Sequence, residues 1–251
     1  MALVALILVP ASPKAQEADH SRYVSPWKTP WTYEQSERWA ELDPAYAACN
    51  GKQQSPIDIR DTQKADLPVL RFEHASRPLK YVINNGATIR VNYYAPGSGS
   101  FVVVGGERYQ LTQFHFHRPS EEQVHGKAYD MVIHLMYQSA GGKVIGVAVL
   151  LKAGKANATI QQLWDHMPER EGQQEVNGVE FSPSGLVPRA TAYYMYMGSL
   201  TAPPCTEGVM WFVLKTPLNI SKEEISAFAR LFPHDVRPVQ PLNGRIVQES
   251  R

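Results

Sequence analysis

One short segment, Gln113-Phe-His-Phe-His117, constrains the fold of this chain most strongly because its side chains alternate in kind. In a β-strand, successive side chains point to opposite faces, so its two histidines share one face and its two phenylalanines share the other. The alternation therefore predicts a strand with an aromatic face and a histidine face. Two ordinary strand histidines would show the same spacing, so the pair by itself is a weak indication of a metal site.

A third histidine, His134, stands in a second run of strand-forming residues, 129–138. There Val132, His134 and Met136 fall on one face, and the polar residues between the two runs suit a connection between antiparallel strands. Three imidazoles from neighbouring strands are what a three-histidine zinc site needs. They leave the fourth tetrahedral position open for water, as in catalytic zinc sites. The three histidines are thus candidate metal ligands.

The chain has 251 residues, of which 43% are hydrophobic, enough for one large domain with a sizeable core or for two small ones. Its 19 prolines and 17 glycines are spread along the chain, so no linker marks a domain boundary. The formal net charge is +1, from 25 basic and 24 acidic side chains, and no basic stripe dominates. This balance argues against nucleic acid as a partner.

Residues 1–10 form a short apolar run, which is followed by a polar stretch to His20. The run is too short to span a bilayer and is typical of the h-region of a secretory signal peptide. It lacks a basic n-region and a clean Ala-x-Ala cleavage site, so the signal could begin upstream of Met1. We expect residues 1–22 to be a signal peptide or a disordered N-terminal segment. Residues 23–251 should form one domain, with no stable membrane insertion after signal removal.

The chain contains two cysteines, Cys49 and Cys205, and neither belongs to a Cys-x-x-Cys motif. An even count beside a signal-like start suggests one disulfide formed in an oxidising compartment. A disulfide that closes so long a loop restricts the unfolded chain and would stabilise the fold by at most about 5 kcal/mol. Two buried free thiols are the alternative.

Strand-forming patterns dominate the middle of the chain, and helical patterns are few. Strands are predicted at residues 79–83, 87–94, 100–104, 109–117, 130–138, 144–152 and 209–215. Helices are predicted at residues 34–40 and 158–167, and after a capping box that begins at Ser221. We therefore expect an α+β, β-rich fold: a single domain around a large, mostly antiparallel, twisted central sheet with peripheral short helices.

A second unusual segment, residues 199–205 (SLTAPPC), contains two consecutive prolines that hold an extended loop. Together with the histidine segments, it gives the chain a specific resemblance to the α-class carbonic anhydrases from about Trp31 to Arg245. The motifs that resemble the family are QSPIDI (54–59), FHFHRPSE (114–121), YMGSLTAPP (196–204), RPVQPLNGR (237–245) and an aromatic segment with Trp31, Tyr33 and Trp39.

The resemblance implies a zinc ion, Zn(2+), at the base of a conical cavity, held by His115, His117 and His134. It implies a carbonate dehydratase that hydrates carbon dioxide reversibly to bicarbonate and a proton. Zinc-bound hydroxide would attack carbon dioxide, oriented by Thr201 and Glu121, because an ionised glutamate takes the threonine proton and leaves the threonine oxygen to accept from the hydroxide. The cysteine positions resemble those of secreted bacterial members, which implies a periplasmic or secreted bacterial protein.

The substrate pocket of this family is apolar, since carbon dioxide makes few hydrogen bonds. The residues that fall on its hydrophobic wall are Met136, Gly146, Leu200, Val209 and Trp211, although each is also an ordinary core residue. The residues expected to support the site from behind are Gln113, Tyr33, Tyr196 and Asn85. Of these, Gln113 precedes His115 by one pleat on the same face, where it can support that ligand.

Some residues depart from the family pattern. Ala87 stands where a proton-shuttling histidine is common, and Ala202 replaces a frequent threonine. Val132 stands where the family usually has a glutamate behind the third zinc ligand, and Glu122 where it usually has a histidine. None of these changes removes a ligand, so they bear on turnover rather than on zinc binding. Glu122 and His125 are candidates for a replacement shuttle.

The main alternative function is that of a non-catalytic, zinc-containing binding protein on the same fold, although such relatives typically lack a ligand histidine. A zinc hydrolase of another class would carry His-Glu-x-x-His, and a periplasmic zinc carrier would expose a His-rich tract. The chain has neither. The sequence does not fix the oligomeric state, and a homodimer remains open.

Overall fold

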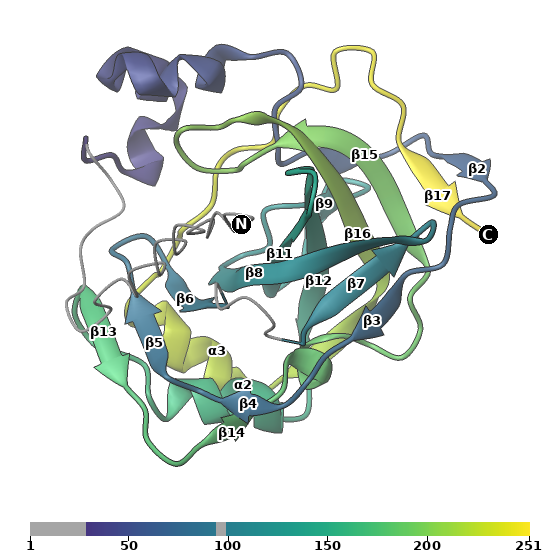
Figure 1. Ribbon diagram of the computed structural model, residues 1–251. Helices are drawn as coiled ribbons and strands as arrows, with labels where there is room; N and C mark the ends of the chain where they lie inside the picture. The colour runs from purple at the N-terminus through teal and green to yellow at the C-terminus, as the bar shows by residue number, and fades with distance from the viewer. Residues whose placement is uncertain (1–28, 94–98) are drawn as a thin grey trace, which may run out of the picture.

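The computed structural model describes residues 29–93 and 99–251. In this part of the chain, a twisted sheet of 12 strands forms the centre of the molecule (Figure 1). Its strand order is β13 (Gly172–Glu175), β5 (Tyr81–Asn84), β6 (Ile89–Asn92), β8 (Glu107–His117), β11 (Met131–Ser139), β12 (Val144–Ala153), β16 (Glu207–Ile220), β15 (Tyr193–Ser199), β17 (Gln248–Ser250) and β2 (Gln63–Ala65), with β7 (Phe101–Val104) paired to β8 and β3 (Arg71–Glu73) to β7. Within this sheet the pairs β12–β16 and β17–β2 are parallel, and the other described pairs are antiparallel. The predicted β-rich fold around a mostly antiparallel sheet is confirmed.

Two smaller sheets and short helices surround the central sheet. The smaller sheets join β1 (Asp58–Ile59), β9 (Gln123–Val124) and β10 (Lys127–Ala128), and β4 (Arg77–Pro78) with β14 (Glu180–Phe181). The helices are α1 (Trp39–Leu42), α2 (Ala158–Trp164) and α3 (Lys222–Ala229), with 3-10 turns η1 (Tyr33–Arg38), η2 (Pro44–Asn50) and η3 (Pro183–Leu186). The capping box predicted at Ser221 is present, since its hydroxyl accepts from the amide of Glu224 and the Glu224 side chain accepts from the Ser221 amide.

The two faces of β8 carry different kinds of side chain. Phe114 and Phe116 are fully buried in the larger hydrophobic core. Helices α2 and α3 contribute Trp164 and Phe228 to this core, and both rings contact Phe116. A slip of the strand by one residue would send the phenylalanines to the other face, so this packing fixes the register. The opposite face is thereby left for the histidines.

A disulfide between Cys49 and Cys205 fastens η2 to the loop that follows β15. The predicted pairing is therefore confirmed. Trp39 and Tyr46 are buried beside the disulfide, and Trp31 and Tyr33 pack against this small cluster. The aromatic N-terminal segment is thus tied to the loop that carries Thr201. The predicted signal segment, residues 1–22, lies outside the described residues.

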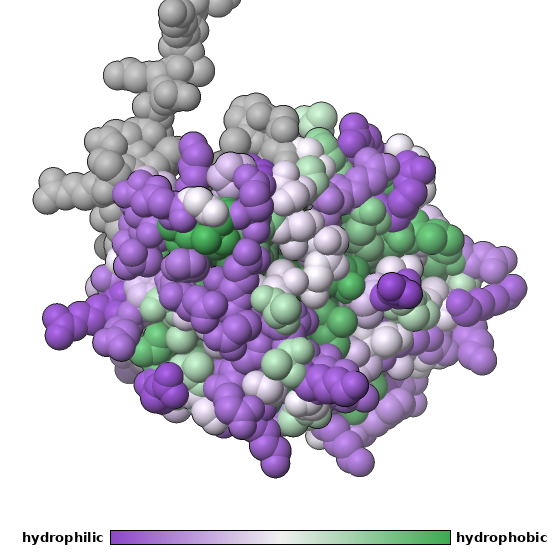
Figure 2. Space-filling view, turned by 90° about the horizontal axis from the view of Figure 1, so that it is seen from below, coloured by the Kyte–Doolittle hydropathy of each residue, from purple (hydrophilic) through white to green (hydrophobic). Residues whose placement is uncertain are grey.

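The surface of the molecule is mainly polar. Figure 2 shows that the face seen from below is covered mostly by hydrophilic side chains, with separate hydrophobic areas between them. The large hydrophobic side chains exposed among the described residues are Val69, Met197, Val239 and Ile246. No helix within residues 29–93 and 99–251 is long and apolar enough to cross a membrane.

Candidate metal centre and active-site pocket

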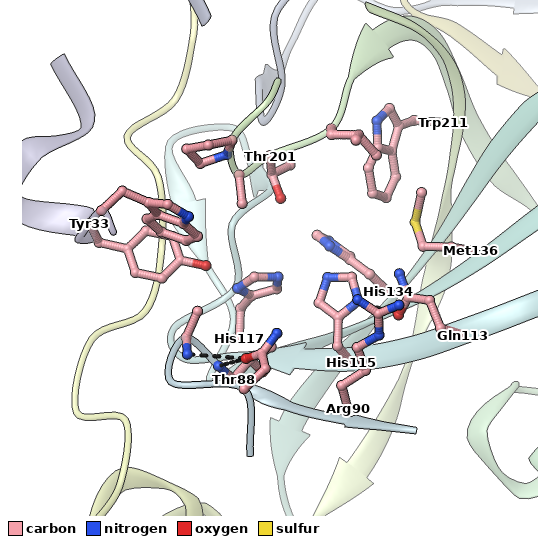
Figure 3. A pocket seen from close by; sticks show the side chains of 16 residues that line it. Tyr33, Thr88, Arg90, Gln113, His115, His117, His134, Met136, Thr201 and Trp211 are labelled. Carbon is pink, nitrogen blue, oxygen red and sulfur yellow. Dashed lines mark hydrogen bonds between the residues drawn. The ribbon is translucent and has the colours of Figure 1, made fainter. Parts of the chain in front are cut away.

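Three histidines converge where β8 and β11 lie side by side (Figure 3). His115 is directly opposite His134 in the antiparallel register, and His117 follows His115 by one pleat on the same face. One ring nitrogen from each histidine lies within 4.8 Å of those of the other two. The strand alternation and the register together therefore produce a compact cluster of imidazole donors.

The outward-facing nitrogen of each imidazole has its own acceptor. His115 Nδ1 lies 2.8 Å from Gln113 Oε1, and His117 Nδ1 lies 2.7 Å from the backbone oxygen of Asp235. His134 Nε2 lies 2.9 and 3.2 Å from the two carboxylate oxygens of Glu122. Because a carbonyl or carboxylate oxygen only accepts, each of these nitrogens carries the proton. The second nitrogen of each ring is then an unprotonated donor of electrons.

Within the described part of the chain, the inward-facing nitrogens of His117 and His134 lack hydrogen-bond partners and have Oε2 of Glu121 nearby, at 3.4 and 3.8 Å. His117 Nε2 and His134 Nδ1 are buried without a hydrogen-bond partner among the described residues, which is costly unless another group binds them. Burial, reinforced by the neighbouring histidines, lowers the pKa of His115 and of His117 well below 6.5, so both rings are neutral. For His134, burial lowers the pKa but the carboxylates of Glu122 and Glu121 outweigh it and raise the pKa above 6.5. Imidazole nitrogens without hydrogen-bond partners fit a zinc ion, which binds nitrogen ligands.

A carboxylate and a hydroxyl lie beside the histidine cluster. Glu121 and Thr201 are 2% and 5% exposed. Oε1 of Glu121 accepts from the amide of Arg237 at 2.9 Å, whereas Oε2 has no hydrogen-bond partner among the described residues and lies 3.4 Å from Nε2 of His117. Burial raises the pKa of Glu121 to about 7, and the Arg237 amide and the nearby Thr201 side chain partly oppose this shift. The structure thus brings both residues of the predicted orienting pair together.

The wall of the pocket is built from a row of residues in register across three strands. Met136 of β11 lies opposite Gly146 of β12, which in turn lies opposite Trp211 of β16. A Cβ atom on Gly146 would lie 2.6 Å from Cζ3 of the Trp211 ring, so the indole packs directly on the glycine backbone. Met136, Trp211 and Leu200 line the pocket. Val209 is buried in the same hydrophobic cluster.

A model of the eukaryotic-type carbonic anhydrase family matches residues 34–251. The chain belongs to this family. A carbonic anhydrase of Neisseria gonorrhoeae is 40% identical over 226 residues, 88% of this chain and 88% of the relative. One of Nostoc sp. is 38% identical over 221 residues, 85% of this chain and 82% of the relative. The structure of the α-carbonic anhydrase of Thermovibrio ammonificans with sulfanilamide aligns at a TM-score of 0.82 and 39% identity, over 88% of this chain and 100% of that one. The predictions of the α-class family and of a carbonate dehydratase are confirmed.

Three of the side chains expected to support the site line the pocket, but they make different contacts there. Gln113 contacts His115, as expected from the strand pleat. Tyr33 lines the pocket, and its ring centre lies 6.4 Å from that of His117. Asn85 also lines the pocket, and its Oδ1 accepts from the backbone amides of Ala87 and Thr88 (Figure 3). Asn85 therefore shapes the turn at the rim.

Tyr196, the other residue expected behind the site, is 2% exposed and belongs to the hydrophobic cluster that contains Trp211. Burial raises the pKa of Tyr196 well above 10, so the phenol is neutral. Its hydroxyl has no hydrogen-bond partner among the described residues. The link between β15 and the QSPIDI segment is made by Ser199 and Ser55, since each backbone amide donates to the hydroxyl of the other residue, at 3.1 and 2.9 Å.

Sequence reasoning missed three residues of this centre. Asp235 supplies the backbone acceptor for His117, and Arg237 supplies the amide for Glu121. Both belong to a distant part of the chain, and no local pattern points to their contacts. Arg90 lies opposite His115 on β6 and lines the pocket; its signal was the strand alternation that puts it on the histidine face.

The candidate replacement shuttles do not reach the pocket in the described part of the chain. Ala87 lines the pocket rim, where a histidine would be suited to carry protons. Glu122 is 0% exposed and lies behind His134. His125 lies in the turn between β9 and β10 of a smaller sheet, with φ of 52°. Neither Glu122 nor His125 is among the described lining residues.

Proposed function

We propose that this chain is a zinc-dependent carbonic anhydrase that converts carbon dioxide and water reversibly to bicarbonate and a proton. His115, His117 and His134 are the zinc ligands. The observation that carries the proposal is the direction of the three imidazoles: each donates to an acceptor outside the centre and turns its other nitrogen inward. A cluster of ordinary buried histidines would not leave inner nitrogens orphaned together.

Zinc held by three histidines lowers the pKa of a water molecule to about 7, a value known for carbonic anhydrases, and so supplies a nucleophile near neutral pH. The chain's own residues orient that nucleophile. In the zinc-loaded protein the Thr201 hydroxyl would donate to Glu121, whose Oε2 has no other hydrogen-bond partner among the described residues, and the Thr201 oxygen would then be available only as an acceptor from the nucleophile. Burial raises the pKa of Glu121 to about 7, and a dication held nearby favours its ionised form.

Carbon dioxide is held by apolar contact. Leu200, Met136 and Trp211 line the side of the pocket beside His134, and the Trp211 ring centre lies 4.6 Å from that of His134. The indole NH of Trp211 donates to the backbone oxygen of Ser199 at 2.9 Å. Because this bond fixes the ring, the wall stays apolar towards the cavity and places the substrate carbon near the oriented nucleophile.

The same proposal includes location and domain organisation. The disulfide between Cys49 and Cys205 supports a periplasmic or secreted protein, because disulfides persist in oxidising compartments. Residues 23–251 form the catalytic domain, and residues 1–22 are the export signal. The partners are carbon dioxide and bicarbonate.

The test compares the wild type with His134→Ala, both purified with zinc, for metal content and carbon dioxide hydration. The wild type should hold one zinc ion per chain and be active. The variant should lose most of its zinc and its activity, because His134 Nδ1 is one of the inward-facing donors. A stoichiometric zinc content in the variant would refute the ligand assignment. Zinc-loaded wild type without hydration activity would instead favour the non-catalytic binding protein.

A further inference from the structure

The acceptor behind His134 comes from a loop and not from the strand that carries this histidine. Glu122 lies between β8 and β9, is 0% exposed, and places both carboxylate oxygens within 3.2 Å of His134 Nε2. Two oxygens converging on a single N–H leave that ring one orientation. The contact therefore determines which nitrogen of His134 faces the metal centre.

The loop that carries Glu122 is itself anchored. The hydroxyl of Ser120 donates to the backbone oxygen of Glu122 at 2.6 Å, and the backbone amide of Tyr129 donates to that hydroxyl at 2.9 Å. The amide of Gln123 donates to the backbone oxygen of Ile57 at 3.2 Å. The backbone on both sides of Glu122 is thus held, and its side chain is directed at His134 by contacts outside the metal centre.

The strand position that could compete for His134 is apolar. Val132 precedes His134 by one pleat on the same face of β11 and is 0% exposed. It packs in the hydrophobic cluster that includes Ile57, Ile59 and Leu150. A glutamate there would bring a second carboxylate to the single Nε2–H of His134, and like charges in a buried site repel. Valine at this position and glutamate at position 122 are therefore mutually consistent.

We propose that Glu122 is the positioning residue of His134: it accepts the Nε2 proton, fixes the tautomer, and presents Nδ1 to the metal, a task for which β11 supplies no acceptor because Val132 occupies the adjacent position. The proposal rests on the zinc centre of the proposed function. It explains two departures from the family pattern, at positions 132 and 122, as one exchange in which the carboxylate moves from strand to loop.

The first test measures zinc release from the holoenzyme into an excess of a chromophoric chelator. Glu122→Ala should accelerate release about ten- to hundredfold, the usual effect of removing a partner of a metal-bound histidine. Glu122→Gln should show a smaller acceleration, because its amide oxygen still accepts from Nε2–H. The control is Glu224→Gln, since Glu224 is an equally buried glutamate that caps α3; its zinc release should match that of the wild type.

The second test moves the carboxylate. Glu122→His alone should speed zinc release, whereas the double variant Glu122→His with Val132→Glu should regain much of the wild-type retention. A Glu122→Gln enzyme that releases zinc as slowly as the wild type, together with a double variant no better than Glu122→His, would overturn the proposal. If the wild type itself binds no zinc, the proposed function fails. If it binds zinc and position 122 has no effect on release, the role of Glu122 fails alone.

Discussion

Individual hydrogen-bond donors decide what the active-site side chains can do. Thr201 has one hydroxyl proton, and the proposed mechanism directs it to Glu121, whose Oε1 is occupied by the Arg237 amide and whose Oε2 has no hydrogen-bond partner among the described residues. An oxygen that has given its proton away can only accept. The orienting effect of Thr201 thus depends on a chain of partners drawn from three separate segments.

Thr201→Ala should lower kcat/KM for carbon dioxide hydration by about a hundredfold, the order of effect of losing one positioned hydrogen-bonding group. Thr201→Ser should keep most of the activity because the hydroxyl remains. Stopped-flow hydration at matched zinc content checks both variants. Equal rates for the alanine and serine variants would remove Thr201 from the mechanism.

Proton transfer is a second property of single residues. The titratable groups that line the described pocket, besides the three candidate ligands, are Tyr33 and Arg90, and Ala87 lies at the rim. Burial raises the pKa of Tyr33 well above 10, so it does not exchange protons near neutrality. An imidazole with a pKa near 6.5 is suited to this task.

Turnover at saturating carbon dioxide should therefore depend strongly on added imidazole buffer, while kcat/KM should not. Ala87→His should raise turnover in dilute buffer and leave kcat/KM nearly unchanged. The measurement is stopped-flow hydration across a buffer series. Fast wild-type turnover in dilute buffer, unaffected by Ala87→His, would mean that another group carries the proton.

Among the strands, those with strong local patterns could be predicted, and those defined by distant partners could not. The alternation in β8 and the apolar run of β12 locate both strands within a few residues. β2 and β17 consist mostly of polar residues and pair with each other in parallel from opposite ends of the chain. β16 runs past the predicted end to Ile220, with a register shift against β12 between Val149 and Leu151. The shift lies beside Pro217, which has no N–H for the ladder and suits an irregularity of this kind.

The residues of the candidate site also fall into those that the sequence could predict and those that it could not. The histidines and Gln113 could be predicted because they share a strand face or lie on the neighbouring strand. Thr201 and Glu121 could be predicted from the motifs that resemble those of the family. The contacts of Glu122, Asp235 and Arg237 could not be predicted, since each joins residues from separate segments through the folded chain.

The contact between His74 and Tyr137 makes the stability of the protein depend on pH. His74 follows β3, and its Nε2 lies 2.9 Å from the hydroxyl of Tyr137 on β11. Burial lowers the pKa of His74 from 6.5 to about 4, so the unfolded state binds a proton more readily than the folded state. The stability that the neutral ring contributes is present above pH 6.5 and is lost as the pH falls towards 4.

The comparison of wild type with His74→Gln by urea unfolding isolates this effect. The wild type should lose free energy of unfolding relative to the variant between pH 6.5 and 4, while the difference stays constant above pH 7. Parallel curves through the acid range would contradict the assignment.

At the scale of the whole molecule, one covalent bond ties the N-terminal segment to the active-site loop. Cys49 and Cys205 are 156 residues apart in sequence, and cross-links that close long loops restrict the unfolded chain most, by up to about 5 kcal/mol. The buried rings of Trp39 and Tyr46 pack around the bond. The disulfide therefore stabilises the fold and holds the segment containing Tyr33 against the pocket.

Reduction, or a Cys49→Ser/Cys205→Ser double variant, should lower the Tm of the protein. Thiol titration of the native, oxidised preparation should find no free cysteine, and calorimetry with and without reductant measures the change in Tm. Two freely titratable thiols, or an unchanged Tm after complete reduction, would contradict this part of the account.

The central claim is that three inward-facing imidazoles make this chain a zinc enzyme that hydrates carbon dioxide. Stopped-flow hydration by the purified protein, before and after metal removal with a chelator and again after zinc is restored, tests it most directly. We expect rapid hydration by the zinc-loaded protein, loss of that activity after metal removal, and recovery on addition of one zinc ion per chain. Zinc-loaded, folded protein that hydrates carbon dioxide no faster than buffer, or activity that survives complete metal removal, would contradict it.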